Sequence, residues 1–215
     1  MIDFSKYSHI IWDWNGTLLD DAWLCVDVMN SMLQERNLPV KTLEEYRNLF
    51  DFPVRDYYLK LGFDFDTEPF EIVGMEFMIR YNKRQKESRL HADVVNVLEA
   101  FSRKHYCQCI LSAREQQELL AETEFYLINS FFNPIYGLED HYAHGKTELG
   151  IRLMTNLEIT PEKALFIGDT CHDAEVAGEI GISCILIPNG HHSVERLKTT
   201  RSPVFSSLSE LIQFI

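Results

Sequence analysis

Two acidic residues stand directly after apolar runs that are typical of buried strands. Asp13 follows the run 9–12, and Asp169 follows the run 164–168. A further acid, Asp173, lies one helical turn beyond Asp169. Carboxylates that face one another repel, and their pKa values rise unless a cation compensates them. Mg²⁺ is the economical cation for such a group, because it prefers oxygen ligands and takes one or two carboxylates while keeping several waters.

Four further residues fall where a phosphate group could be held against these acids. Gly16 lets the backbone approach a ligand closely, and Thr17 offers a hydroxyl and an N–H near a helix start. Ser112 follows a third strand-like run, and Lys146 opens a helix after a fourth. A nucleophilic carboxylate, a metal ion, hydroxyl donors and an ammonium group are what phosphoryl transfer to a carboxylate requires. The sequence therefore predicts a phosphate site at the carboxyl edge of a sheet.

The elements that must position these residues alternate in type along most of the chain. Strands are expected at 9–12, 106–111, 134–137, 164–167 and 183–187, and the helices between them at 94–101, 115–129, 146–156 and 173–180. This alternation predicts a Rossmann-like, doubly wound parallel sheet with helices on both faces.

One segment interrupts the alternation. Residues 20–89 carry almost no strand signal and show long helical periodicities at 22–36, 43–50, 54–61 and 71–86. We therefore predict a core formed by residues 1–19 and 90–215, with residues 20–89 inserted after the first strand as a separate helical unit.

Composition excludes several classes of protein. With 46% hydrophobic and 25% charged residues, the chain of 215 residues resembles soluble globular proteins rather than disordered or fibrous ones. Its 33 acidic and 20 basic residues give a net charge of −13, so we expect neither nucleic acid nor an anionic membrane as a partner. The sequence shows no signal peptide and no apolar run of membrane-spanning length, and we expect a cytoplasmic protein.

The five cysteines show no paired spacing of the kind that metal sites use. We expect them to be small apolar side chains in a reduced interior, including the alternating pair Cys107 and Cys109.

Four segments, in this order, resemble the motifs of the haloacid dehalogenase-like superfamily. They are Asp13-Trp14-Asn15-Gly16-Thr17-Leu18-Leu19-Asp20, then Leu111-Ser112-Ala113, then Lys146, and finally Gly168-Asp169-Thr170-Cys171-His172-Asp173. The resemblance covers nearly the whole chain, and the helical insertion is similar to the family's four-helix cap. Within the superfamily the chain is most similar to phosphoglycolate-phosphatase-like members.

The resemblance implies a role for each matched residue. Asp13 would be the nucleophile that forms an aspartyl-phosphate, and Lys146 would restrain it. The substrate's phosphoryl group would be bound by Thr17, Ser112, Ala113 and Lys146. Mg²⁺ would be held by Asp13, Asp169 and the backbone carbonyl of Asn15, with Asp173 close by. The implied substrate is a small phosphorylated metabolite, such as phosphoglycolate or a sugar phosphate.

The first motif departs from the family pattern at Asn15. Family phosphatases usually carry Asp there, which protonates the leaving group and then activates water, whereas an amide does not titrate near neutrality. General acid–base help contributes roughly 10²–10⁴ in rate. Three interpretations follow. The protein is a slow phosphatase, or one restricted to good leaving groups such as acyl phosphates. Alternatively, His172, His191 or His192 replaces the acid, or the protein is a binding or regulatory protein that holds a phosphorylated ligand without turning it over.

Other residues receive a structural interpretation. We expect the loop histidines His191 and His192 to be exposed and inert. Helical spacing places four methionines in the core of the helical segment: Met29, Met32, Met75 and Met78.

The helical segment also carries cationic side chains. Arg47 and Arg55 flank a probable loop over the site, where either could bind a second anionic group of the substrate. A phosphonatase would need a lysine from this segment, and Lys41, Lys60, Lys83 and Lys86 are the candidates.

Overall fold

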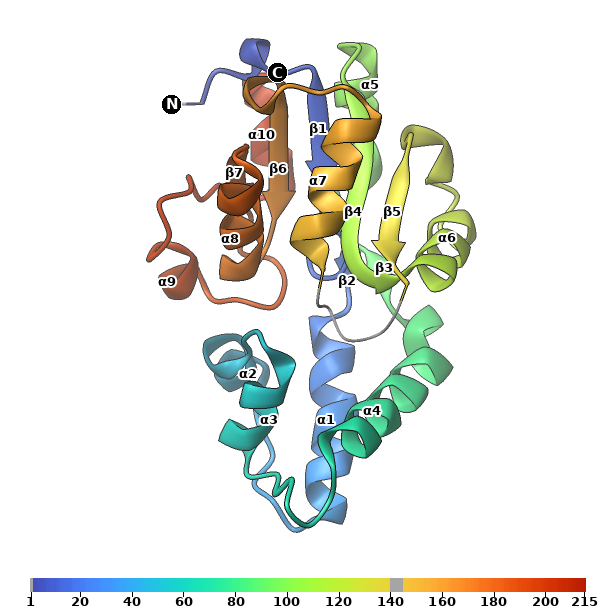
Figure 1. Cartoon of the computed structure of the whole chain (residues 1–215), viewed down its shortest axis with the longest axis vertical. Coiled ribbons are helices and arrows are strands. Elements are labelled where there is room, and N and C mark those ends of the chain that lie inside the picture. The colour runs from blue at the N-terminus through green and yellow to red at the C-terminus, as the bar shows by residue number, and fades with distance from the viewer. Residues whose placement is uncertain (1, 140–144) are drawn as a thin grey trace.

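A five-stranded parallel sheet forms the centre of the protein. The computed structural model describes residues 2–139 and 145–215 (Figure 1). The sheet has the order β5-β4-β1-β6-β7, and every neighbouring pair is parallel. Its strands are β1 (His9–Trp12), β4 (Cys107–Glu115), β5 (Ile135–Leu138), β6 (Ala164–Gly168) and β7 (Ser183–Leu186). The strand order reverses beside β1, and such a switch point is where ligands bind in open α/β sheets.

Helices cover both faces of this sheet. Side chains of β1 alternate between two apolar clusters, with Ile10 and Trp12 in one and Ile11 in the other. The first cluster also takes residues from α5 (Val94–Arg103), α6 (Gln116–Phe125) and α10 (Leu208–Leu211). The second takes residues from α7 (Lys146–Asn156), α8 (Cys171–Ile180) and α9 (Val194–Leu197). The predicted Rossmann-like, doubly wound fold is confirmed.

Four further helices lie beyond the carboxyl edge of the sheet (Figure 1). They are α1 (Ala22–Glu35), α2 (Leu43–Leu49), α3 (Val54–Leu61) and α4 (Phe70–Arg84), and they bury an apolar cluster of their own. An antiparallel pair of two-residue strands, β2 (Leu19–Asp20) and β3 (Arg89–Leu90), lies where the chain enters and leaves this segment. The domain division at residues 20 and 89 stays a prediction, and we refer to α1–α4 as the cap helices.

Short 3-10 turns complete the chain at Phe4–Lys6, Gln85–Glu87, Asn129–Phe131, Pro161–Lys163 and Ile212–Phe214. Within the described residues, no helix combines the length and apolar character needed to cross a membrane.

Several boundaries differ from the sequence expectation, among them three in the core. Strand β4 continues to Glu115, so that Ser112 lies within the strand rather than after it. Helix α8 begins at Cys171 instead of 173, because Thr170 and Asp173 cap each other's backbone N–H groups in a capping box. Helix α6 ends at Phe125 rather than 129, just before Leu127, which adopts a φ of 59°.

The cysteine prediction was wrong for one residue. Cys25, Cys109 and Cys184 are buried and Cys171 is half-buried, but Cys107 is exposed because it is the first residue of β4 and lies at the end of the sheet. All five cysteines are free thiols.

Candidate active site

The carboxyl edge of the sheet brings together residues from three distant segments. Asp13 follows β1 and Asp169 follows β6, which are neighbouring strands. The Lys146 ammonium, from the first residue of α7, donates to Asp13 Oδ1 at 2.6 Å and to Asp173 Oδ1 at 2.7 Å. The hydroxyl of Thr17 donates to Asp169 Oδ1 at 2.8 Å. All five side chains are buried.

Two glycines make this close packing possible. Gly16 adopts a φ of +77°, and a Cβ there would lie 2.3 Å from Asp169 Oδ2. A Cβ at Gly190 would lie 2.1 Å from the same oxygen and 2.5 Å from the Cα of Gly16. Any larger residue at either position would displace the carboxylate.

Three carboxylates crowd the centre of the site. One oxygen of each of Asp13, Asp169 and Asp173 lies within 4.8 Å of the others. Burial raises the pKa of Asp13 to about 6 against the opposing effect of Lys146, and it raises the pKa of Asp169 to about 7. These two acids are therefore proton acceptors in the neutral range, as expected of carboxylates that need a compensating cation.

Asp173 differs from the other two acids because its oxygens are already engaged. Oδ1 accepts from Lys146, and Oδ2 accepts from the Thr170 hydroxyl at 2.7 Å and from the backbone N–H groups of Thr170 and Asp169. Although burial raises its pKa, the ammonium and these donors outweigh that effect and lower it. Asp173 caps α8 and holds Lys146 against Asp13.

The side chain of Asn15 joins the core to a cap helix. Its Nδ2 donates to Asp21 Oδ2 at 2.8 Å and to the hydroxyl of Tyr81 at 3.0 Å. Tyr81, from α4, in turn donates to Asp21 at 2.7 Å, and Asp21 also accepts from the Gly16 N–H. An amide suits this position because it supplies a donor to the buried Asp21 carboxylate.

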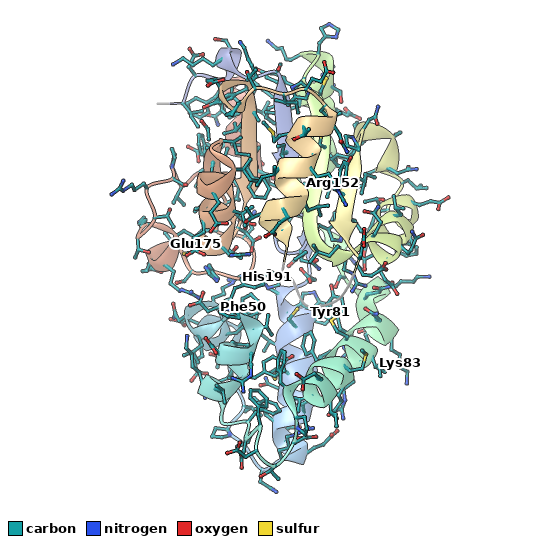
Figure 2. The ribbon with its side chains drawn as sticks, viewed as in Figure 1. Phe50, Tyr81, Lys83, Arg152, Glu175 and His191 are labelled. Atoms are coloured by element: carbon teal, nitrogen blue, oxygen red, sulfur yellow. The ribbon has the colours of Figure 1, made fainter. Side chains whose placement is uncertain are left out.

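The expectation that the two loop histidines are exposed was wrong, because both residues are buried. The His191 ring contacts the Tyr46 hydroxyl at 2.8 Å and Asp21 at 3.4 Å, and the backbone N–H of His191 donates to Asp169 Oδ2 at 2.6 Å. Burial lowers the pKa of His191, but Asp21 outweighs it and raises the value to about 9. Figure 2 shows His191 between the sheet and the cap helices, near Phe50 and Tyr81.

His192 has a different environment. Burial lowers its pKa to about 3, and its Nδ1 accepts from the Cys171 N–H at 3.0 Å. This neutral ring is a structural contact at the start of α8.

The cationic side chains of the cap helices have different positions. Arg47 donates to the carbonyls of Gly190 and Asn189, so it fixes the loop that carries His191. Arg55 lies over the Phe65 ring and lines a cavity between the sheet edge and the cap helices. Lys146 is the one lysine among the described residues that line this cavity, so none of the four lysines considered for a phosphonatase contributes to its lining.

A cavity of about 1010 Å³ extends from these acids into the space between the sheet edge and the cap helices. Asp13, Asn15, Ser112, Ala113 and Lys146 line its sheet end. The sequence analysis placed four methionines in the cap core, and Met29 and Met32 lie there. For Met75 and Met78 the interpretation was wrong, because both line the cavity and Met75 is exposed.

Sequence reasoning missed Asp21, Tyr81 and the ion pair between Arg114 and Glu122. Arg114 lies in β4, and its guanidinium binds Glu122 at 2.8 Å with both side chains buried. Trp14 donates to the same carboxylate at 2.6 Å. An arginine within an apolar strand, two residues after Ser112, was the available signal, since a buried charge requires a partner.

Comparison with known proteins agrees with this architecture. The sequence profile for "haloacid dehalogenase-like hydrolase" matches residues 10–187. A probable phosphatase (IndB) of Dickeya dadantii is 22% identical over 210 residues, which cover 94% of this chain and 91% of that protein. A haloacid dehalogenase-like hydrolase from Streptococcus pneumoniae is similar in structure, with a TM-score of 0.84, 21% identity, and coverage of 98% of this chain and 99% of that one. A predicted phosphoglycolate phosphatase from Haemophilus somnus has a TM-score of 0.79 and 17% identity, covering 97% of each chain. Because the profile spans most of the chain and its motifs meet at one edge of the sheet, this protein belongs to the haloacid dehalogenase-like hydrolase family.

Proposed function

We propose that this chain is a Mg²⁺-dependent phosphohydrolase that transfers the phosphoryl group of a soluble phosphomonoester to Asp13 and then to water. The observation that carries the proposal is the 2.6 Å contact between the Lys146 ammonium and Asp13 at the floor of a cavity. The phosphatase name of the Dickeya relative supports the same reaction class.

The acids of the site suit a hard cation. Asp13 and Asp169 have raised pKa values and oxygens within 4.8 Å of one another, and Lys146 is the ammonium that lies between Asp13 and Asp173. Asp13, Asp169 and the backbone carbonyl of Asn15 would hold Mg²⁺, whereas the oxygens of Asp173 are engaged by Lys146 and Thr170. When bound, the ion would neutralise charge on the phosphoryl oxygens.

Asp13 performs the first bond exchange. One of its carboxylate oxygens attacks phosphorus, the Asp13–phosphorus bond forms, and the bond to the leaving oxygen breaks. The Lys146 ammonium and the Ser112 hydroxyl offset the charge on the phosphoryl oxygens. Ser112 is buried and accepts from the Arg114 N–H at 3.0 Å, which orients its hydroxyl while leaving the proton available for the substrate.

The second bond exchange returns the carboxylate. Water attacks phosphorus, the bond to Asp13 breaks, and inorganic phosphate leaves. Both exchanges need a proton to move, first to the leaving oxygen and then from water. Asn15 cannot carry it, and both ring nitrogens of His191 face Tyr46 and Asp21. His172 also lines the cavity, where it stacks on Phe52, and it would be the substitute.

The test is release of inorganic phosphate from acetyl phosphate and from alkyl phosphomonoesters, measured with Mg²⁺ and with EDTA. We expect release that EDTA abolishes, with acetyl phosphate preferred because its leaving group needs no proton. Release that persists unchanged in EDTA would contradict the metal assignment.

A second candidate function rests on Asn15. Its amide is committed to Asp21 and Tyr81, so the usual acid is missing from a site that is otherwise complete. A phospholigand-binding or regulatory protein with weak catalysis would bind phosphomonoesters in Mg²⁺ and release no phosphate from any of them, acetyl phosphate included.

Mg²⁺ affinity is expected to rise with pH. Asp13 and Asp169, with pKa values of about 6 and about 7, bind protons below neutrality in the metal-free fold, and a metal must displace those protons. Affinity should therefore increase by up to about tenfold per pH unit for each proton displaced, between about pH 5.5 and about pH 7. Calorimetric titration with Mg²⁺ at several pH values measures this, and an affinity that falls as pH rises would contradict it.

A further inference from the structure

We propose that the substrate of this site is a phosphomonoester whose leaving group carries an apolar ring and no second anionic group. This inference rests on the proposed function and replaces the expectation of phosphoglycolate or a sugar phosphate. It draws on the size of the cavity, the character of its walls, a glycine in α4 and the balance of charge around the lining.

The cavity is large for a two-carbon acid. Its volume of about 1010 Å³ lies at the upper end of the range of roughly 300–1,000 Å³ that accommodates drug-sized ligands. Phosphate would occupy only the end formed by Asp13, Ser112 and Lys146. A glycolate group would leave most of the remaining volume to water against apolar walls, whereas a ring would displace that water.

The walls beyond the phosphate end are aromatic and thioether side chains of the cap helices and the segments that join them. Half-buried or exposed side chains from this group present surface to the cavity: Phe50, Phe52, Phe70, Met75, Phe77 and Met78. Several rings already pack in pairs, with Phe50 against Phe52 at 5.3 Å and Phe77 stacked on Tyr81 at 6.1 Å. Rings attract further rings in such arrangements, and methionine adapts to their edges. Figure 2 shows Phe50 and Tyr81 on opposite sides of the space below His191.

Gly74 enlarges the cavity from within α4. Glycine is the least favourable residue in a helix interior apart from proline. Among the described residues, and apart from its own helix backbone and chain neighbours, the nearest atom to a Cβ built at this position lies 3.8 Å away in the Phe70 ring, so packing does not require glycine there. Because Gly74 lines the cavity, the missing side chain leaves room for a ligand.

The charge around the cavity disfavours a second anionic group. Seven acidic side chains line it, against three from lysine and arginine. Lys146 is paired with Asp13 and Asp173, and Arg114 with Glu122. The remaining cations of the lining are Arg55, which lies over the Phe65 ring, and His191, whose ring is held by Asp21 and Tyr46. A carboxylate or second phosphate would therefore face a wall with more acids than bases, whereas an uncharged ring would meet no such repulsion.

The proposed preference for an apolar ring is tested with two esters, 3-phenylpropyl phosphate and propyl phosphate. Both leaving groups are primary alkoxides of matched basicity, so that the missing acid at Asn15 affects them equally. We expect kcat/KM for the phenyl ester to be about tenfold to hundredfold higher, because burying a phenyl group contributes that factor. The carboxylated analogue, 4-phosphonooxybutyrate, should show no gain over propyl phosphate.

The variant Gly74→Leu tests whether the ring enters this cavity. We expect it to lower kcat/KM for the phenyl ester at least fivefold, to leave propyl phosphate unchanged, and to keep the fold intact because a Cβ is accommodated. Gly178→Leu on α8 is the matched control, since Gly178 is an exposed helical glycine with nothing within 4 Å of its Cβ. It should change neither ester.

Failure of this inference can be distinguished from failure of the proposed function. Equal kcat/KM for both esters, or an equal loss for both in Gly74→Leu, would overturn the ring specificity while leaving the phosphatase in place. The binding of both esters is also measured by calorimetry on the Asp13→Asn variant. A tenfold or greater preference for the phenyl ester there supports the ring specificity even when the wild-type protein releases no phosphate, and equal binding overturns it.

Discussion

Replacing Asp13 by Asn abolishes phosphate release, with an expected loss on the order of 10⁴-fold or more, as for removal of a nucleophile. The amide is nearly isosteric, and its oxygen still accepts from the Lys146 ammonium, so the substrate pocket keeps its shape. What it loses is the charge that attacks phosphorus. The measurement is steady-state phosphate release in Mg²⁺ with acetyl phosphate as the substrate.

A measurement of thermal stability distinguishes the loss of the nucleophile in Asp13→Asn from unfolding of the variant. Because burial raises the pKa of Asp13 to about 6, the charged form is disfavoured in the metal-free fold above that pH. The unfolding midpoint of metal-free Asp13→Asn at pH 8 should therefore be no lower than that of the wild type. Asp66→Asn, at an exposed position, is the control and should change neither property. An Asp13→Asn variant that still turns over would remove Asp13 from the nucleophile role.

Replacing Asn15 by Asp should raise the turnover of alkyl phosphates by roughly 10²–10⁴-fold, the usual contribution of a general acid–base group. The new carboxyl group would take the place of an amide that lies 2.8 Å from Asp21. Two carboxylates at that distance cannot both ionise readily, so the pair would share a proton near neutrality. That proton is what a leaving alkoxide needs. Acetyl phosphate leaves without a proton, so its kcat/KM, which reports the transfer to Asp13 rather than the later attack of water, should gain much less.

Asn15→Ala is the matched control for this prediction. It removes the bonds to Asp21 and Tyr81 and supplies no proton, so it should not raise turnover of any ester. Equal gains for Asn15→Asp and Asn15→Ala, or no gain with alkyl phosphates, would show that Asn15 does not limit the reaction.

The sheet and the arrangement of its edge were predictable from the sequence for a physical reason. Strand runs such as 164–168 are buried on both faces, so that they stand out as continuous apolar segments, and parallel strands must bring their following residues to one edge. That topology explains why three residues spread over more than a hundred positions of the chain lie together at this edge: Asp13, Lys146 and Asp169.

The cap side of the site was not predictable in the same way. Helical spacing of Met75 and Met78 is compatible with a core face or a cavity face, and only the packing of α4 against its neighbours distinguishes the two. The burial of His191 depends on Tyr46 from a cap helix and on Asp21, neither of which carries a local signal. The structural role of Asn15 was hidden for the same reason, since its partner Tyr81 lies 66 residues away.

The central claim is that Asp13 accepts the phosphoryl group, and the direct measurement is the mass of the protein quenched in acid during turnover of acetyl phosphate with Mg²⁺. Because Asn15 cannot activate water for the second exchange, we expect the phosphoenzyme to accumulate. The protein should gain the mass of one phosphoryl group, located on the peptide that contains Asp13 and absent in Asp13→Asn. A phosphoryl group on another residue, or phosphate release by Asp13→Asn at the wild-type rate, would contradict the account.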